Sequence, residues 1–406
     1  MRVFLASFVF LIAFSLPVRA ESNTDLCEGH DWFQMRDKVA GGGASLLCKG
    51  AVDASFEHRS AAERELKTVI RKMPHSASSY RAHAHLVSMY HREGRNRKAL
   101  EQLNQMLAEK SDAEDVKAIH PMFEVLARNP DQTVASSRPS TLRTETIEGN
   151  LFLPVTASGI TGYYIADTGA NISAMCESEA RRLGLKLEET STKLGDINGT
   201  GSTMHLAVVP DMWIGKTHLK NVAFTIYPDA NEPFVDLPKG HKGVLGIPVL
   251  IALGAFRVDK DNRVDILPGP ATTSNKGLPV AFDAQNPTIQ MSLNGKKFIF
   301  TLDTGAERTE LWPVFASAFP DLMRTGIKKD HKITGISGSA THESIELPAV
   351  HFSLGKDITL APASVLANAD VPGSEWAGGN LGFDLVSQLT PITFDFRAMQ
   401  LIVEDR

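Results

Sequence analysis

Two stretches decide the fold: residues 163–170 read YYIADTGA, and residues 299–306 read IFTLDTGA. Each stretch runs from aromatic and β-branched residues into an Asp-Thr-Gly-Ala tetrapeptide, the pattern of a strand that ends in a tight loop. The two aspartates, Asp167 and Asp303, are separated by 136 positions (303 minus 167). The repeat predicts two related units within one chain.

The same separation aligns three further features downstream of the aspartates without a gap. A single Asp-Thr-Gly triplet is weak evidence, because three residues recur by chance, whereas four features in one register are strong evidence. After residue 146 the chain also consists of short apolar runs broken by Gly, Pro, Asn and Asp, which is typical of a mainly β fold. The further aligned pairs are Gly199 with Gly335, Gly246 with Gly382, and Asp259 with Asp395.

These features resemble those of the retropepsin and pepsin aspartic proteases, over roughly residues 146–406. The string LGFDL at 381–385 is similar to that of single-domain bacterial retropepsin-like proteins. The resemblance implies a mainly β, two-lobed aspartic protease fold in which each lobe supplies one aspartate to a pair at the seam. Carried over by position, the catalytic residues are Asp167 and Asp303.

Paired carboxylates suit peptide hydrolysis. Two carboxylates about 3 Å apart cannot both be ionised, so they share one proton and their apparent pKa values split. The ionised member can then act as general base on a water molecule, while the protonated member acts as general acid toward the peptide. This chemistry calls for no metal, no cofactor and no covalent nucleophile. The expected function is that of an aspartic endopeptidase acting on a polypeptide substrate.

The residues that follow each aspartate are expected to support the pair. Gly169 and Gly305 lack a Cβ, which lets the loop approach closely behind each carboxylate. By resemblance, Thr168 and Thr304 hydrogen-bond across the seam and lock the two loops together.

The fourth residue of each loop predicts the pH range of activity. Ala170 and Ala306 stand where pepsin-like enzymes usually place Ser or Thr, and retropepsins place Ala. A hydroxyl donating to the carboxylate would favour its charged form, so its absence leaves the pair easier to protonate. We therefore expect activity at mildly acidic to near-neutral pH.

Two Gly-rich segments, 195–203 and 333–340, are expected to form hairpin tips. By resemblance they are flaps that close over an extended peptide, one in each lobe as in retropepsins. The substrate-binding candidates at these tips are Gly199, Gly201, Gly335 and Gly338.

The N-terminus predicts the compartment. Arg2 is followed by an apolar run up to Phe14 and then by Val18-Arg19-Ala20, the pattern of a cleaved secretory signal peptide at 1–20. The run is shorter than the ~20 residues that a membrane anchor needs, so no stable membrane span is expected after cleavage. We expect a secreted or periplasmic protein. In that oxidising setting Cys27 and Cys48 could form a disulfide, although their spacing leaves the pairing open, and Cys176 is left over.

The chain divides into three larger units. A helical region precedes the β region, with apolar residues at spacings of three and four. Leu86, Tyr90, Gly94 and Ala99 in it loosely resemble a tetratricopeptide hairpin. The predicted boundaries are a signal peptide at 1–20, a helical domain at 21–135, a linker at 136–146, a first lobe at 147–267, an inter-lobe linker at 268–287 and a second lobe at 288–406.

Composition narrows the alternatives. The 406 residues carry a net charge of −5, which gives no basic footprint for nucleic acid, and no zinc motif occurs. Two other classes of function remain open: an inactive peptide-binding protein with a protease-like fold, and a scaffold acting through its helical domain. That domain could present substrates, bind a partner protein or cover the catalytic site.

Overall fold

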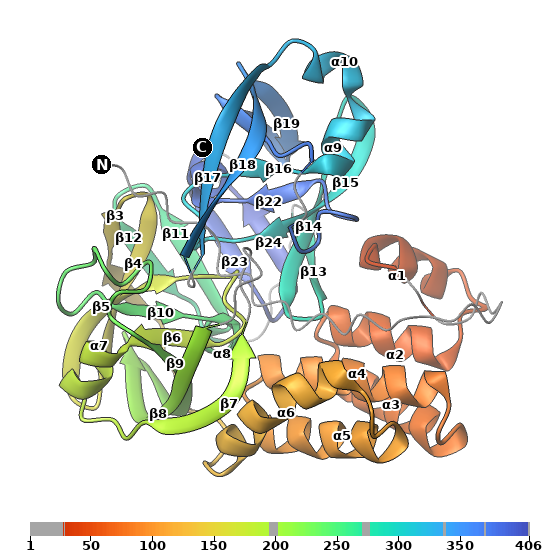
Figure 1. Ribbon diagram of the computed structural model, residues 1–406, viewed down its shortest axis with the longest axis vertical. Coiled ribbons are helices and arrows are strands. Elements are labelled where there is room, and N and C mark those ends of the chain that lie inside the picture. Colours follow the sequence, from red (N-terminus) through yellow and green to blue (C-terminus); the bar gives the residue numbers. More distant parts are fainter. Residues whose placement is uncertain are drawn as a thin grey trace.

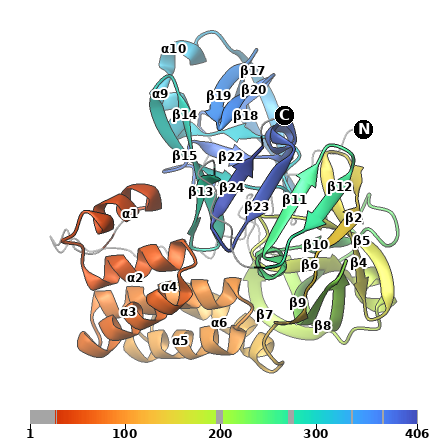
Figure 2. The same cartoon turned by 180° about the vertical axis from the view of Figure 1, so that it is seen from behind.

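The computed structural model describes residue 27 and residues 29–194, 202–269, 277–335, 338–368 and 371–404. Within these residues an N-terminal helical domain is followed by two mainly β lobes (Figure 1), which agrees with the predicted fold class. Seen from behind, the helices lie side by side in layers next to both lobes (Figure 2). The predicted signal peptide, and Gly199 and Gly201 of the first predicted flap, lie outside the described residues.

The helical domain is a series of helices in which each packs on the next. One face of each amphipathic helix is buried, as the full burial of Leu66, Leu86 and Leu103 shows. Gly94 lies between two helices with a φ of +70°, and a Cβ there would collide with the side chain of Gln132. The helices described in this domain are α1 (Trp32–Ala40), α2 (Leu46–Ser55), α3 (Arg59–Lys72), α4 (Ala77–Arg92), α5 (Asn96–Glu109) and α6 (Glu114–Ala127).

A disulfide joins Cys27 to Cys48 at the start of this domain, which resolves the pairing that the sequence left open. Cys176 is a buried free thiol in the first lobe. None of the helices in the described ranges is both long and apolar enough to cross a membrane.

The first lobe is a curved sheet in which β8 pairs with β4, β7 and β9. The edge strand β1 (Thr133–Ser136) leads from the helical domain onto β9, and β3 (Glu145–Ile147) pairs with β4. The other elements are β4 (Asn150–Ala157), β5 (Ile160–Ala166), β6 (Ser173–Cys176), α7 (Glu177–Arg182), β7 (Glu188–Leu194), β8 (Ser202–Ile214), β9 (Thr217–Tyr227), β10 (Gly243–Leu245) and α8 (Ile247–Leu253).

The second lobe repeats the central part of this arrangement. Its strands β14 (Asn286–Leu293), β15 (Lys296–Leu302) and β22 (Gly379–Leu381) have the bounds of β4, β5 and β10 shifted by 136 positions, the separation of Thr168 and Thr304. The other elements are β16 (Glu310–Leu311), α9 (Pro313–Ala318), α10 (Pro320–Met323), β17 (Ile327–Gly335), β18 (Gly338–Leu347), β19 (Val350–Leu354), β20 (Lys356–Leu360), β21 (Ala363–Val365), α11 (Phe383–Val386) and η1 (Ser387–Leu389).

Strands from both lobes form one sheet beneath the seam, in the order β13-β24-β23-β11-β12-β2. In its centre β11 of the first lobe pairs antiparallel with β23 of the second, from Ala255 opposite Asp395 to Val258 opposite Ile392. This pairing fixes one lobe against the other. The strands are β2 (Ser140–Arg143), β11 (Ala255–Asp259), β12 (Arg263–Ile266), β13 (Gly277–Asp283), β23 (Ile392–Asp395) and β24 (Gln400–Val403).

Strands occupy part of both segments that were predicted to be linkers. The segment 136–146 contains β2 and the start of β3, and β2 adds an edge to the joint sheet through β12. The segment 268–287 contains β13 and the first residues of β14. Its Pro and Gly content suggested a linker, but Val280, Ala281 and Phe282 are buried, and β13 pairs with both β14 and β24. Tertiary burial outweighs local composition here.

Candidate active site

Each Asp-Thr-Gly loop begins where a central strand of its lobe ends. Asp167 follows β5, and its N–H donates to the carbonyl of Leu245 in β10 at 3.0 Å. Asp303 follows β15, and its N–H donates to the carbonyl of Leu381 in β22 at 2.9 Å. Because β10 and β22 run parallel to the strands that carry the aspartates, both loops are held in equivalent positions (Figure 1).

Thr168 and Thr304 fasten the two loops to each other. The Thr168 N–H donates to Oγ1 of Thr304 at 3.1 Å, and the Thr304 N–H donates to Oγ1 of Thr168 at 3.0 Å. Each hydroxyl then donates across the seam, from Thr168 to the carbonyl of Leu302 at 2.7 Å and from Thr304 to that of Ala166 at 2.6 Å. These four buried hydrogen bonds form a reciprocal contact between the loops, of the kind that the family resemblance implied.

The glycines bring each carboxylate against the opposite loop. A Cβ on Gly169 would lie 2.5 Å from Cγ of Asp303, and a Cβ on Gly305 would overlap the carboxyl of Asp167. Any side chain at either position would therefore push the carboxylates apart. The structure thus brings Asp167 and Asp303 together at one buried site, with relative exposures of 0% and 1%.

The electrostatics of this site favour a shared proton. Burial, the charge of Asp303 and a hydrogen bond between the two carboxyls raise the pKa of Asp167 well above its usual range. Oδ1 of Asp167 accepts from the Gly169 N–H at 2.7 Å, whereas Oδ2 is buried without a donor among the described residues. Two carboxylate oxygens are both acceptors, so Oδ2 can bond to Asp303 only when one carboxyl carries a proton.

The two carboxylates differ in the donors to their Oδ2 atoms. Oδ1 of Asp303 accepts from the N–H groups of Gly305 at 3.0 Å and Ala306 at 3.1 Å. Oδ2 of Asp303 accepts from Nδ2 of Asn380 at 3.0 Å. Ala170 and Ala306 are buried and bring no hydroxyl to the pair.

Asn380 was missed by sequence reasoning. The sequence did carry a signal for Asn380. Val244 is its equivalent at the separation of 136 positions, so the first lobe has an apolar residue where the second has an amide.

The strands of the second predicted flap are described up to its tip, with residues 336 and 337 outside the described ranges, and the first predicted flap is described only at its base. Strands β17 and β18 pair antiparallel up to Gly335 opposite Gly338. Strands β7 and β8 pair on both sides of the undescribed segment, ending with Leu194 opposite Ser202. No described cluster of three or more His, Cys, Asp or Glu side chains is arranged to hold a metal ion.

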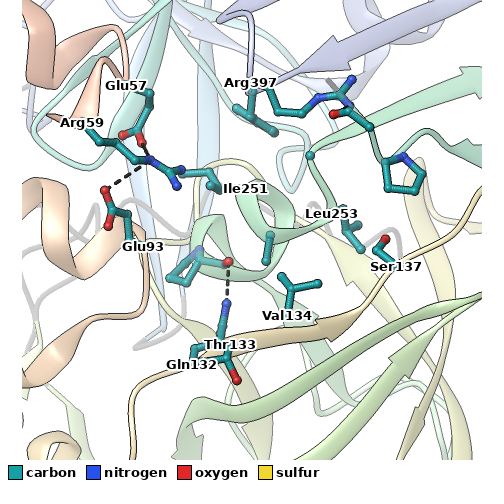
Figure 3. A pocket seen from close by; sticks show the side chains of 16 residues that line it. Glu57, Arg59, Glu93, Gln132, Thr133, Val134, Ser137, Ile251, Leu253 and Arg397 are labelled. Carbon is teal, nitrogen blue, oxygen red and sulfur yellow. Dashed lines mark hydrogen bonds and ion pairs between the residues drawn. The ribbon is translucent and has the colours of Figure 1, made fainter. Parts of the chain in front are cut away.

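A separate cavity of about 500 Å³ lies where the helical domain meets the lobes (Figure 3). Its charged side chains pair with each other or with neighbours: Arg59 with Glu57 and Glu93, and Arg397 with Asp395. This cavity lacks both aspartates of the pair. We interpret it as part of the junction between domains and not as the active site.

Comparison with known proteins agrees with this geometry. A family model described as aspartyl protease matches residues 153–249, which includes Asp167 and Gly246. A crystal structure of a retropepsin-like aspartic protease from Rickettsia conorii matches with 20% identity and a TM-score of 0.25, over 34% of this chain and 94% of that chain. No match is found among curated proteins. The described residues thus form a mainly β, two-lobed fold preceded by a helical domain, and residues 153–249 of the first lobe are similar to aspartyl proteases.

Proposed function

We propose that the protein is an aspartic endopeptidase and that Asp167 and Asp303 are its catalytic pair. The observation that carries this proposal is the meeting of two buried carboxylates, one from each lobe, each against the glycine of the opposite loop. One chain supplies both carboxylates, so the site needs no second copy.

The proposed reaction is the addition of water across a peptide bond. The ionised carboxylate takes a proton from the water as its oxygen bonds to the carbonyl carbon, and the protonated carboxyl gives its proton to the carbonyl oxygen. The C–N bond of the tetrahedral intermediate then breaks, the leaving nitrogen takes up the first proton, and one hydroxyl of the intermediate returns its proton to the other carboxyl. Thr168 and Thr304 hold together the two loops that carry these carboxyls.

Incubation with a mixed peptide library at several pH values tests the proposal. We expect the mature protein to cut peptides, and Asp167→Asn and Asp303→Asn each to lower the rate by about 10²-fold or more, because each removes one acid–base partner. Asp384→Asn is the matched control, since its carboxylate accepts from the N–H and hydroxyl of Thr309 outside the pair. Cleavage by either pair variant at the wild-type rate would refute the assignment. No cleavage by the wild-type protein at any pH would favour the inactive peptide-binding protein.

We also propose that the protein is secreted or periplasmic after removal of residues 1–20, and that its lobes arose by internal duplication. The disulfide between Cys27 and Cys48 supports an oxidising compartment. Strands β14 and β15 have the same lengths as β4 and β5 and begin at the same constant offset from them, which supports duplication. Mass spectrometry of protein purified from the producing cells tests the compartment, with a mature N-terminus at Glu21 as the expected result and retained residues 1–20 as the contrary one.

The helical domain is proposed to brace the two lobes. Its helix α6 contacts β7 at the base of the first predicted flap, where the Met122 N–H donates to Oγ1 of Thr192 at 3.0 Å. At its other end the domain contacts the β13–β14 turn, where Nε2 of Gln285 donates to the carbonyl of Ser88 at 3.3 Å. Contacts with both lobes favour bracing over a free domain that recruits a partner.

A further inference from the structure

The two aspartates differ in the hydrogen-bond donors to their Oδ2 atoms. Oδ2 of Asp303 accepts a hydrogen bond from the Asn380 amide at 3.0 Å, whereas Oδ2 of Asp167 is buried without any donor among the described residues. The two loops are otherwise built alike, from the same four residues and the same reciprocal threonine contacts. The difference therefore comes from outside the loops.

Asn380 is itself held in one orientation. Its Oδ1 accepts from the hydroxyl of Thr301 at 2.5 Å, so its Nδ2 faces Asp303. Thr301 lies opposite Asn380 in the parallel pairing of β15 and β22. Both residues are buried, with exposures of 6% and 1%. A buried amide with both ends bonded is a rigid donor.

The first lobe has no equivalent of the hydrogen bonds that join Thr301, Asn380 and Asp303. Val244 and Ile165 take the equivalent positions, and they lie opposite each other in the parallel pairing of β10 and β5. Both are buried and apolar, with exposures of 0% and 1%. The two Asp-Thr-Gly loops are thus alike, but only Asp303 accepts a hydrogen bond from a side chain of the neighbouring strand.

We propose that Asn380, oriented by Thr301, is a positioning residue that makes Asp303 the ionised member of the pair and leaves the shared proton on Asp167. This proposal rests on the proposed function. An amide N–H bonded to a carboxyl favours the charged form, because the hydrogen bond is stronger to a negative oxygen. Asp303 is then the base that takes the proton from water, and Asp167 is the acid that protonates the carbonyl oxygen. When the C–N bond breaks, the proton on Asp303 passes to the leaving nitrogen and a hydroxyl proton of the intermediate returns to Asp167.

The raised pKa of Asp167, caused by its burial and by the neighbouring charge of Asp303, agrees with this division. Other titratable groups lie close to Thr301 and Asn380. Glu310 in β16 lies opposite Asn380 in the antiparallel pairing of β16 and β22, and it pairs with His331 of β17 at 2.9 Å. Asp384 is bonded to Thr309 at the start of α11. A test must therefore observe the two aspartates individually.

Two measurements on the full mature chain test the proposal. The first is the pH profile of kcat/KM for wild type, Asn380→Val and Thr301→Val on one cleaved peptide. Asn380→Val copies the first lobe, and we expect its acidic limb to move upward by about one pH unit or more, since a lost bond to a charged group is worth that much. We expect Thr301→Val to shift the limb in the same direction by less. Thr288→Val is the matched control, because Thr288 is also buried and lies opposite Thr301 but donates to the carbonyl of Ala281.

The second measurement is a carbon-13 NMR titration of the aspartate carboxyls, with the two signals assigned through Asp167→Asn and Asp303→Asn. We expect Asp303 to ionise before Asp167 in wild type, and this order to be lost in Asn380→Val. Equal titration of the two carboxyls in wild type, or an unchanged order and acidic limb in Asn380→Val, would overturn the proposal. If the wild-type protein cuts no peptide, the proposed function fails, and the titration still decides the role of Asn380.

Discussion

Arg92 offers the sharpest test of how the helical domain is attached. Its guanidinium lies 2% exposed at the end of α4, and its Nε pairs with Glu57 at 2.9 Å. Nη2 donates to the carbonyl of Ala54 at 2.7 Å, Nη1 donates to the carbonyl of Ala284 in the β13–β14 turn, and the group stacks on the Phe282 ring with its Cζ at 4.5 Å from the ring centroid. One side chain thus connects the helical domain to the second lobe.

Arg92→Met should destabilise the protein by about 3 to 5 kcal/mol, the usual cost of removing one partner of a buried ion pair. The apolar chain keeps much of the volume, so the loss is that of the charge and its donors. The carbonyls of Ala54 and Ala284 would lose a charged donor, at about 1 to 3 kcal/mol each. Glu57 retains its contact with Arg59 at 2.9 Å, which keeps the total below the sum of the separate losses.

Urea unfolding followed by tryptophan fluorescence measures this effect. Trp32 is a suitable probe, because its Nε1 donates to Asp283 of the same junction at 2.8 Å. Arg64→Ala is the matched control, since Arg64 is 66% exposed in the same domain and pairs with Glu65 only at 3.5 Å; it should change stability by less than about 1 kcal/mol. If Arg92→Met and Arg64→Ala unfold at the same urea concentration, the junction does not hold the domains as we describe.

Three further predictions concern the catalytic loops and the disulfide. Thr304→Val removes a hydroxyl that bonds to Thr168 and Ala166. It should lower the free energy of unfolding by about 2 to 3 kcal/mol and slow cleavage. An effect no larger than that of Thr156→Val, at an exposed hydroxyl pair, would contradict the reciprocal contact. Because the folded state raises the pKa of Asp167 above its usual 3.8, its proton stabilises the fold at low pH, and this contribution is lost as pH rises through the raised value. The difference in unfolding free energy between wild type and Asp167→Asn should therefore fall with increasing pH, and urea unfolding curves whose difference is the same at every pH would refute this. Replacing Cys27 and Cys48 by Ser should lower the free energy of unfolding by about 3 kcal/mol, given their separation of 21 residues. Cys176→Ala is the control, because this cysteine lies outside the disulfide. Equal urea midpoints for the protein with and without the disulfide would show that it adds no stability.

The sequence was sufficient to predict the two lobes and the residues that meet at their seam. A constant separation of two Asp-Thr-Gly loops implies equivalent places in equivalent units, whereas the contact of these loops across a seam was implied only by the family resemblance. What it could not predict depends on contacts distant in sequence. Val280 to Phe282 became a strand because they are buried between β14 and β24, against the local composition.

The attachment of the helical domain was also beyond the sequence. Nothing in the residues around Arg92 indicates a partner nearly two hundred positions away. Arg92 is among the largest fully buried side chains described. A charge pattern does not reveal burial when another domain supplies the cover.

The most direct test of the proposed catalytic pair is a crystal structure of the protein with a peptide in which a hydroxymethylene group replaces the scissile amide. Our account predicts that the hydroxyl oxygen lies within about 3.2 Å of a carboxylate oxygen of both Asp167 and Asp303. A peptide bound elsewhere, or a hydroxyl that contacts one aspartate alone, would contradict it.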